Sequence, residues 1–160
     1  MNNSKNYRAY FKTECGVWEL SGFKSKITNF RPVVKAKKEI GVCPSNVKSR
    51  VKAYFTGVSK RPKLELFDLR GTPLQNKVWE SLLGINWGKT VSYTQIAKKI
   101  GHPAAVRAVA NAIGANPIAV LIPCHRVLGK DGSLTGYAYG LKKKLWLLMH
   151  EQRYNNRPWV

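Results

Sequence analysis

The chain has 160 residues, with 28 Lys or Arg against 8 Asp or Glu, so its formal net charge is +20 at pH 7. No apolar run approaches the roughly 20 residues of a membrane helix, and the start lacks a signal-peptide core, so we expect no membrane partner. Three cysteines are too few for a disulfide framework and suit a reducing compartment, the cytoplasm or a eukaryotic nucleus. A surface this basic predicts a nucleic-acid partner, the alternative being a basic protein with no specific polyanion.

The predicted fold class is α+β. Residues 1–65 are expected to form a small, strand-rich α/β domain, and residues 66–160 a mainly helical domain with a winged-helix-like helix-turn-helix. The first domain has apolar stretches of strand length and one stretch with helical spacing. These predicted elements are residues 7–11, 17–20 and 27–30 as strands and residues 46–55 as a helix. Lys60-Arg61-Pro62-Lys63 is the expected connector.

Four helices are predicted after the connector, at residues 72–83, 92–100, 103–113 and 141–152. Ser92 with Gln95 three residues later is a capping box, and Gly101 is expected to end that helix. Pro103 suits the first turn of the next helix, and Gly114 its C-terminal stop. Two short helices joined by a tight turn indicate a helix-turn-helix, although a simple packing hairpin has the same pattern.

The helix predicted from Pro103 is built almost entirely of small residues around Arg107. A helix that reads the major groove would carry several polar side chains. A helix of small residues can instead approach the minor groove closely and insert its arginine. The alternative is a buried packing helix with Arg107 as a surface charge.

On the last predicted helix, Leu141, Leu145 and Leu148 are expected to form the apolar face, while residues 142–144 face water. Continuing this spacing places Glu151 near the apolar face, where a carboxylate needs a partner, and His125 is the natural one. The alternative is a solvated Glu151 at a frayed helix end. His150 is expected to be exposed or to act as a charge at the helix C-terminus.

The sequence Pro123-Cys124-His125-Arg126-Val127 follows the apolar run at residues 118–122. Neighbouring basic groups can lower the pKa of a cysteine thiol from about 8.5, so Cys124 and His125 are a candidate nucleophile and base. A metal ligand and an inert buried cysteine are the alternatives. The remaining Cys and His residues have no paired metal-site spacing, so we predict no metal.

Residues 54–151, about sixty per cent of the chain, resemble one family, the O6-alkylguanine-DNA alkyltransferases. The first fifty residues match it poorly. The similarity follows a series of motifs in order and spacing, of which Pro-Cys-His-Arg-Val is the most specific. The motifs are Tyr54-Phe55-Thr56-Gly57, Gly71-Thr72-Pro73-Leu74-Gln75-Asn76-Lys77-Val78-Trp79, Trp87 to Ala97, Arg107-Ala108-Val109, Asn116-Pro117, Ile122 to Val127, Gly136-Tyr137 and Leu147-Leu148-Met149-His150-Glu151.

The resemblance implies a stoichiometric DNA repair protein that takes the alkyl group of O6-alkylguanine onto Cys124, acts once, and needs no cofactor. The base would be rotated out of the duplex, with Arg107 in the vacated space and Ala108 beside it at the DNA. His125 would accept the thiol proton through a water, and Glu151 would orient His125. The partner would be double-stranded DNA and the protein a monomer; O4-alkylthymine is left open as a substrate.

The resemblance also implies roles for residues around the cysteine. Asn116 would tie the helix-turn-helix to the cysteine loop, and the Tyr93 hydroxyl would donate to the base. The alkyl pocket would be formed by Ala119, Val127, Tyr137, Ala138 and Tyr139. The chief alternative function is a non-catalytic helix-turn-helix module that binds or regulates at DNA lesions; a cysteine hydrolase is the third, although the chain lacks an oxyanion-hole motif.

Overall fold

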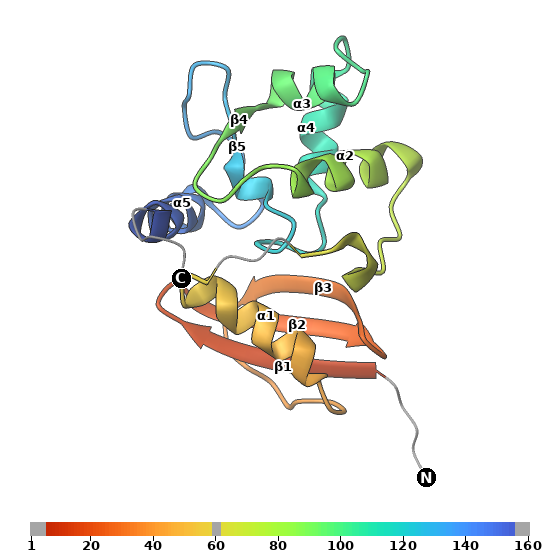
Figure 1. Ribbon diagram of the computed structural model, residues 1–160, viewed down its shortest axis with the longest axis vertical. Coiled ribbons are helices and arrows are strands. Elements are labelled where there is room, and N and C mark those ends of the chain that lie inside the picture. The colour runs from red at the N-terminus through yellow and green to blue at the C-terminus, as the bar shows by residue number, and fades with distance from the viewer. Residues whose placement is uncertain (1–5, 59–61, 156–160) are drawn as a thin grey trace. The chain divides into compact units, whose positions relative to one another are not determined.

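The structure is a computed structural model that describes residues 6–58 and 62–155, and it confirms a mixed α+β fold (Figure 1). The chain forms two compact units: residues up to Leu69 together with Pro117–Leu121, and Arg70–Asn116 together with the chain from Ile122 onward. The return of Pro117–Leu121 to the first unit was not predicted. The division at residues 65 and 66 stays a prediction, and Lys60 and Arg61 of the expected connector lie outside the described residues.

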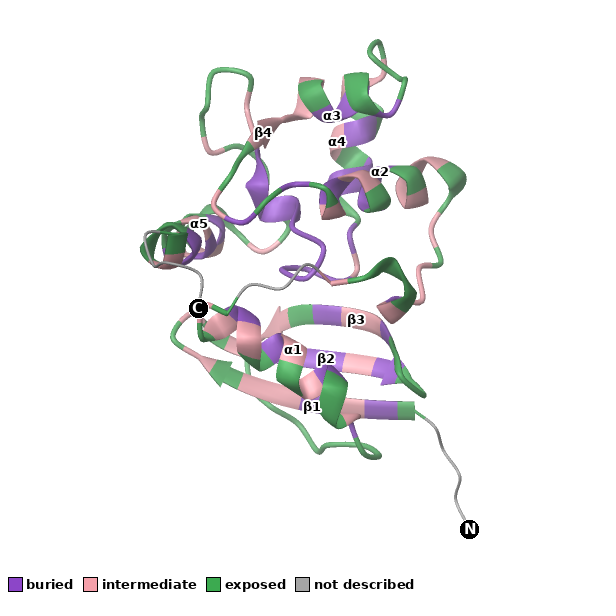
Figure 2. Ribbon diagram, in the orientation of Figure 1, coloured by how far each residue is buried: buried purple, intermediate pink, exposed green. Residues whose placement is uncertain are grey.

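The first unit is a three-stranded antiparallel sheet with one helix. Two-residue turns connect its three strands, which pair in chain order. The strands are β1 (Asn6–Thr13), β2 (Gly16–Phe23) and β3 (Lys26–Val33), and the helix is α1 (Ser45–Phe55). All four confirm the predicted elements, and the strands are longer than predicted. Figure 2 shows buried residues along the strands and on one side of α1.

The aromatic core of this unit fixes α1 on the sheet. The Phe55 ring lies 5.9 Å from that of Trp18 and 6.5 Å from that of Phe30. Both Trp18 and Phe30 are fully buried. Burial of such large rings is the main source of stability in so small a unit.

Pro117–Leu121 lies along β3 and then turns sharply. The Phe30 N–H donates to the Pro117 carbonyl, and its carbonyl accepts from the Ala119 N–H. The next residue, Val120, has φ of 71°, a left-handed conformation that is strained for a β-branched residue, and the Leu121 N–H donates to the Ala119 carbonyl across it. The apolar run at residues 118–122 is therefore an isolated bridge and a tight turn instead of a strand.

The second unit begins with a short helical bundle. It contains α2 (Pro73–Leu83), α3 (Tyr93–Lys99) and α4 (Val106–Gly114). Capping boxes at Thr72 and Ser92 start α2 and α3, as their sequences indicate. Gly101, with φ of 79°, ends α3, and the His102 N–H returns to the Ala97 carbonyl in a Schellman motif.

Helix α4 differs at both ends from its prediction. It begins at Val106, because residues 102–105 form a turn in which the Ala105 N–H donates to the His102 carbonyl. Pro103 therefore lies before the helix. Gly114 is its last residue and does not adopt a left-handed conformation, so it is no stop signal here. The helices α3 and α4 still succeed each other across a short turn, as in a helix-turn-helix; the winged detail stays a prediction.

The rest of the second unit supports the cysteine motif. The two-residue strands β4 (Val91–Ser92) and β5 (Val127–Leu128) pair in parallel, and the short 3-10 helix η2 (Cys124–Arg126) leads into β5. A second 3-10 helix, η1 (Leu64–Leu66), belongs to the first unit. The chain then enters the helix α5 (Leu141–Asn155), longer than predicted.

The buried face of α5 is not the predicted one. Leu141 and Leu145 are nearly half exposed, whereas Lys144 is fully buried. His150 is also buried, stacked on Trp146 at 4.9 Å, so the prediction of an exposed histidine was wrong. Glu151 is fully buried, which excludes a solvated helix end. The leucine spacing predicted the wrong face because the buried polar groups of this helix have partners on other segments of the folded unit.

Candidate active site

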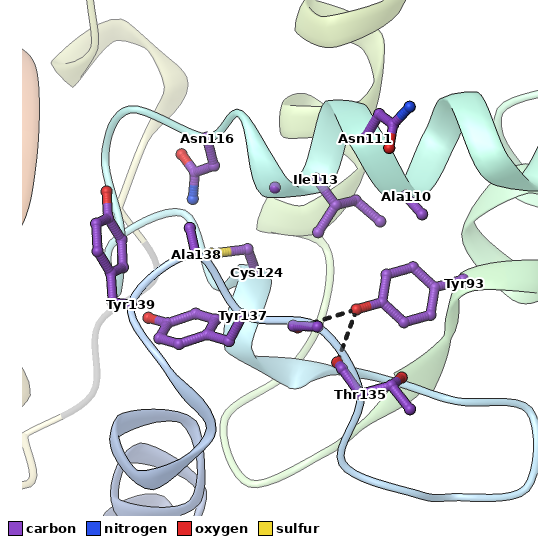
Figure 3. A pocket seen from close by; sticks show the side chains of 12 residues that line it. Tyr93, Ala110, Asn111, Ile113, Asn116, Cys124, Thr135, Tyr137, Ala138 and Tyr139 are labelled. Carbon is purple, nitrogen blue, oxygen red and sulfur yellow. Dashed lines mark hydrogen bonds between the residues drawn. The ribbon is translucent and has the colours of Figure 1, made fainter.

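Cys124 is the first residue of η2 and lies at the wall of a cavity of about 380 Å³ (Figure 3). Pro123 sets its direction, because the Cys124 N–H donates across it to the Ile122 carbonyl at 2.8 Å. The residue is only 7% exposed, so its sulfur is reached through the cavity. This volume is in the range of small-molecule sites.

The cavity is formed by α3, α4, η2 and the loop before α5, all within the second unit. Its lining residues are Tyr93, Ala110, Asn111, Ile113, Gly114, Asn116, Cys124, Thr135, Gly136, Tyr137, Ala138 and Tyr139. Tyr137, Ala138 and Tyr139 thus lie at a pocket, which is where the family resemblance placed them. Val127 is fully buried but does not line the cavity, and Ala119 belongs to the first unit; neither fits its predicted place.

Two polar side chains of the cavity are held in place by backbone carbonyls. The Tyr93 hydroxyl donates to the carbonyls of Thr135 at 3.0 Å and Gly136 at 3.2 Å, as the dashed lines of Figure 3 show. Asn116 is buried, and its amide donates to the Ile122 carbonyl at 2.8 Å. Asn116 therefore connects the end of α4 to the chain entering the cysteine motif.

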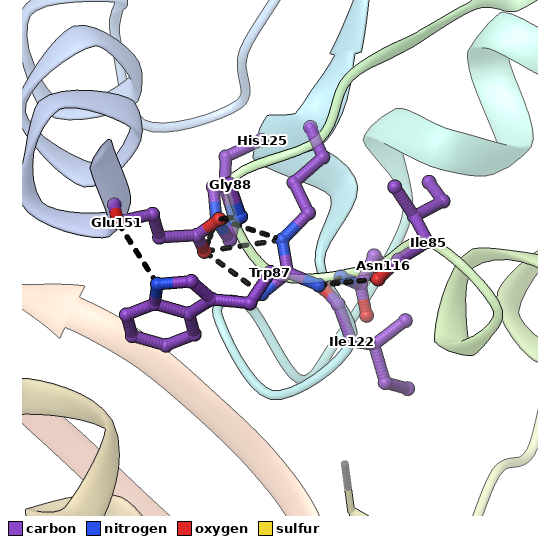
Figure 4. Close-up of polar contacts among 8 residues, drawn as sticks. Ile85, Trp87, Gly88, Asn116, Ile122, His125 and Glu151 are labelled. Carbon is purple, nitrogen blue, oxygen red and sulfur yellow. Dashed lines mark hydrogen bonds and ion pairs between the residues drawn. The ribbon is translucent and has the colours of Figure 1, made fainter. Parts of the chain in front are cut away.

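His125, the residue after Cys124, belongs to a buried ionic network around Glu151 (Figure 4). His125 Nε2 contacts Glu151 Oε1 at 2.6 Å, and both side chains are fully buried. Arg126 donates from Nε to both carboxylate oxygens and from Nη2 to Oε1 at 2.9 Å. The Gly88 N–H donates to Oε2, and the Trp87 indole to the Glu151 backbone carbonyl. The carboxylate thus has contacts with His125, Arg126 and Gly88.

Burial sets the protonation states of this site. It raises the pKa of the Cys124 thiol, and a hydrogen bond from Asn116 and the charge of Lys144 only partly oppose it. Burial also lowers the pKa of His125, against the raising effect of Glu151. For Glu151, burial alone would raise the pKa, but His125 and Arg126 outweigh it and hold the pKa below its usual value. At neutral pH the site holds a thiol, a neutral imidazole and a carboxylate.

The protonation state of Cys124 corrects one expectation. Its basic neighbours in sequence were expected to lower the pKa of the thiol, but Arg126 turns away from the sulfur and pairs with Glu151. A resting thiol needs a base at the moment of attack, and a buried neutral imidazole next in sequence is a suitable one.

The exposed face of α4 carries Arg107, Ala108 and Asn111, while Val109, Ala112 and Ile113 are buried. The helix is therefore not wholly buried, and Arg107 is exposed at its N-terminal turn. Asn111 follows one turn later and also lines the cavity. The exposed side chains between Arg107 and Asn111 are small, so this face of α4 can approach another molecule closely.

Two supporting groups were not predicted from the sequence. Gly88, with φ of 67°, lies 63 residues before its partner Glu151 in the sequence. The neighbouring residues in the sequence do not mark its N–H as a hydrogen-bond donor to a carboxylate. Lys144 gave a usable signal, because it precedes Glu151 by two helical turns and so shares its face. The apolar leucines beside it concealed that signal.

Membrane-spanning helices and metal clusters are both absent from the described ranges, 6–58 and 62–155. No helix there combines the length and apolar character needed to cross a membrane. No cluster of three or more His, Cys, Asp or Glu side chains that could hold a metal ion is found among them.

A mixed α+β fold with a buried cysteine, histidine and glutamate beside a ligand-sized cavity is compatible with a class of protein that uses a nucleophilic thiol. The family model described as "6-O-methylguanine DNA methyltransferase, DNA binding domain" matches residues 73–153. A methylated-DNA–protein-cysteine methyltransferase of Mycobacterium leprae is 43% identical over 140 residues, covering 83% of this chain and 84% of that protein. The chain therefore belongs to the O6-methylguanine-DNA methyltransferase family.

Other relatives are similar over a shorter span. A probable methylated-DNA–protein-cysteine methyltransferase of Acanthamoeba polyphaga mimivirus is 54% identical over 100 residues. This match spans 62% of the chain and 62% of the viral protein, so it covers less than two thirds of either. A Salmonella typhimurium relative is 43% identical over 113 residues, with 68% of this chain and 63% of the relative covered.

Solved structures extend the similarity to the whole fold. The Mycobacterium tuberculosis O6-methylguanine methyltransferase superposes with a TM-score of 0.79 at 36% identity, covering 97% of this chain and 96% of that one. The crystal structure of Mycobacterium tuberculosis OGT in complex with DNA gives a TM-score of 0.79 at 39% identity, with 91% and 92% covered.

Proposed function

We propose that this chain repairs O6-alkylated guanine in double-stranded DNA by transferring the alkyl group, once, to the sulfur of Cys124. The observation that carries the proposal is the position of Cys124, at the wall of a ligand-sized cavity and directly before the buried His125–Glu151 pair. Family membership and the relative solved with DNA support it. The protein is proposed to act as a monomer, in the cytoplasm or in the nucleus of a eukaryote.

The first step is removal of the thiol proton. Because Nε2 of His125 contacts Glu151, the proton goes to Nδ1, through a bridging water. The Glu151 carboxylate stabilises the imidazolium that forms, and Arg126 keeps the carboxylate ionised and fixed. The sulfur attacks the alkyl carbon, its bond to guanine O6 breaks, and the electron pair remains on the guanine.

The leaving guanine carries a negative charge unless a proton donor meets it. Burial keeps the pKa of the Tyr93 hydroxyl above its usual value, so the hydroxyl is protonated at neutral pH and can donate to the base. The product at Cys124 is a thioether, and the proposed site holds no group to cleave it. One protein molecule therefore removes one alkyl group.

The base must leave the DNA stack to reach a cysteine that is 7% exposed. The exposed face of α4, with Arg107 among small residues, is suited to the minor groove, and the arginine would fill the space of the extruded base. The net charge of +20 supplies attraction to the phosphates, which carries affinity rather than sequence reading. O4-alkylthymine is a second substrate that this cavity could admit.

A labelling experiment tests the proposal. The protein is incubated with a duplex that carries radiolabelled O6-methylguanine, and we expect one label per protein molecule, on the peptide containing Cys124. Cys124→Ser should bind the duplex and take no label, while Cys43→Ser, a buried cysteine of the first unit, should label as the wild type does. Label released as free product through many turnovers refutes single transfer. Binding without any labelling favours the non-catalytic alternative.

A further inference from the structure

The buried ammonium of Lys144 is the charged group near the cavity that the chemistry above does not use. Its side chain has no exposed surface, and Nζ donates to the carbonyls of Val127 at 2.6 Å, Thr135 at 2.7 Å and Gly136 at 3.1 Å. An ammonium has three donors, so these carbonyls use all of them. A charge is buried at high cost unless its hydrogen bonds replace water, which these three do.

The three carbonyls come from two different segments. Val127 belongs to β5, directly after η2, whereas Thr135 and Gly136 open the loop that continues into Tyr137. This loop forms one wall of the cavity. Lys144 on α5 therefore ties that wall to the strand that follows the cysteine.

The Tyr93 hydroxyl contacts two of the same carbonyls. It donates to those of Thr135 and Gly136, while Lys144 Nζ lies 5.8 Å from the centre of the Tyr93 ring. A phenol has one proton, so a hydroxyl that donates to a bound base must leave both carbonyls. Thr135 and Gly136 are exposed residues, but their hydrogen bonds to Lys144 Nζ are partly buried, so Lys144 is a protein donor that they keep when the hydroxyl turns.

We propose that Lys144 is a positioning residue for alkyl transfer, which keeps the carbonyls of Thr135 and Gly136 hydrogen-bonded and so allows the Tyr93 hydroxyl to turn to the alkylated guanine. The inference rests on the proposed function, because the base is the acceptor to which the hydroxyl turns. Lys144 touches no reacting atom, and its effect on the reaction passes through Tyr93.

A double-mutant cycle tests this dependence. Transfer of the methyl group from the labelled duplex is timed at saturating protein for wild type, Lys144→Met, Tyr93→Phe and the double variant. Lys144→Met should slow transfer by about tenfold or more, the effect of roughly one hydrogen bond to a charged group. In the Tyr93→Phe background the same substitution should slow it less than about threefold, because no hydroxyl remains to be released. Lys142→Met, an exposed lysine of the same helix, should react as the wild type does.

The outcomes separate the two proposals. A wild type that takes no label refutes the proposed function, whatever Lys144 does. If the wild type takes the label but Lys144→Met slows transfer equally with and without Tyr93→Phe, the positioning role is overturned. Lys144 would then only support the fold. The positioning role is also overturned if Lys144→Met slows transfer in neither background.

The pH profile tests the positioning role where Lys144→Met does not fold. Burial lowers the pKa of Lys144 to about 8, and the titratable groups facing it are Tyr93 on α3 and Cys124 and His125 on η2. The ratio of wild-type to Tyr93→Phe rates cancels the titration of Cys124 and His125, and Tyr93 itself stays protonated because its pKa is raised. We expect this ratio to fall as Lys144 loses its proton above pH 8. A constant ratio up to about pH 9.5 overturns the proposal.

Discussion

Replacing Arg126 by methionine should destabilise the protein more than its place next to the proposed catalytic pair, His125 and Glu151, suggests. The Arg126 guanidinium makes three contacts of 2.9–3.1 Å with the Glu151 carboxylate, which has no exposed surface. Methionine keeps the apolar stem and removes the cation. Glu151 keeps His125 and the Gly88 N–H as partners, but it loses the cation that balances its buried charge.

Removing one partner of a buried pair costs about 3–5 kcal/mol. For a domain of this size each kcal/mol lowers the melting temperature by about 2–4 °C, so Arg126→Met should melt about 6–20 °C below wild type. The double variant Arg126→Met/Glu151→Leu removes both charges and should recover at least half of that loss. Its alkyl transfer should not recover, because His125 has lost the group that orients it.

Thermal unfolding followed by circular dichroism measures both variants at pH 7 and equal ionic strength. Arg153→Met is the matched control, because this arginine of α5 is exposed and should change the melting temperature little. A loss below about 1 kcal/mol for Arg126→Met, the usual value of an exposed ion pair, would show that water replaces the guanidinium and refute the reasoning.

Three further outcomes are expected. Arg107→Ala should slow repair of duplex DNA far more than reaction with the free modified base, which has no stack to leave. Equal slowing of the two reactions in rate assays would show that Arg107 does not fill the space of the extruded base. Tyr139→Gly should speed inactivation by free O6-benzylguanine by about ten- to a hundredfold, because the Tyr139 ring lines the cavity and takes up space that a benzyl ring needs. Rapid inactivation of the wild type contradicts this. The acid limb of the transfer rate should lie below pH 6.5, because the pKa of His125 is lowered by burial. The free energy of unfolding should also fall as the pH falls. The unfolded chain protonates His125 at a higher pH than the folded protein does, so stability decreases below about pH 6.5. Glu151, with its depressed pKa, adds a further loss below about pH 4.3.

Local signals in the sequence predicted much of the fold. The capping boxes at Thr72 and Ser92 and the glycine after α3 act within a few residues, so they are readable without tertiary information. The three strands could also be predicted from local signals, because they are short apolar segments connected by two-residue turns. The motif around Cys124, with Glu151 as the expected partner of His125, predicted which side chains lie together.

What failed depends on contacts between distant segments. Pro103 is compatible with a helix start, but the turn that places α4 begins at His102. The leucines of α5 have good helical spacing, yet the carbonyls of the cavity wall select Lys144 for the interior instead of Leu145. The pKa of Cys124 is a third case, because its burial cannot be read from neighbours in sequence.

The network around Glu151 also determines when, during synthesis of the chain, Cys124 can acquire the chemistry proposed for it. Glu151 follows His125 by 26 residues and its partners at residues 87 and 88 by more than 60, and it lies on the last described helix. Chains are made from the N-terminus at about 5–20 residues per second, so Cys124 is synthesised a few seconds before Glu151, the partner of His125. Until α5 docks, His125 next to Cys124 lacks the Glu151 carboxylate that contacts it in the folded protein. A nascent or C-terminally truncated chain is therefore expected to present Cys124 without the base assembly proposed for it.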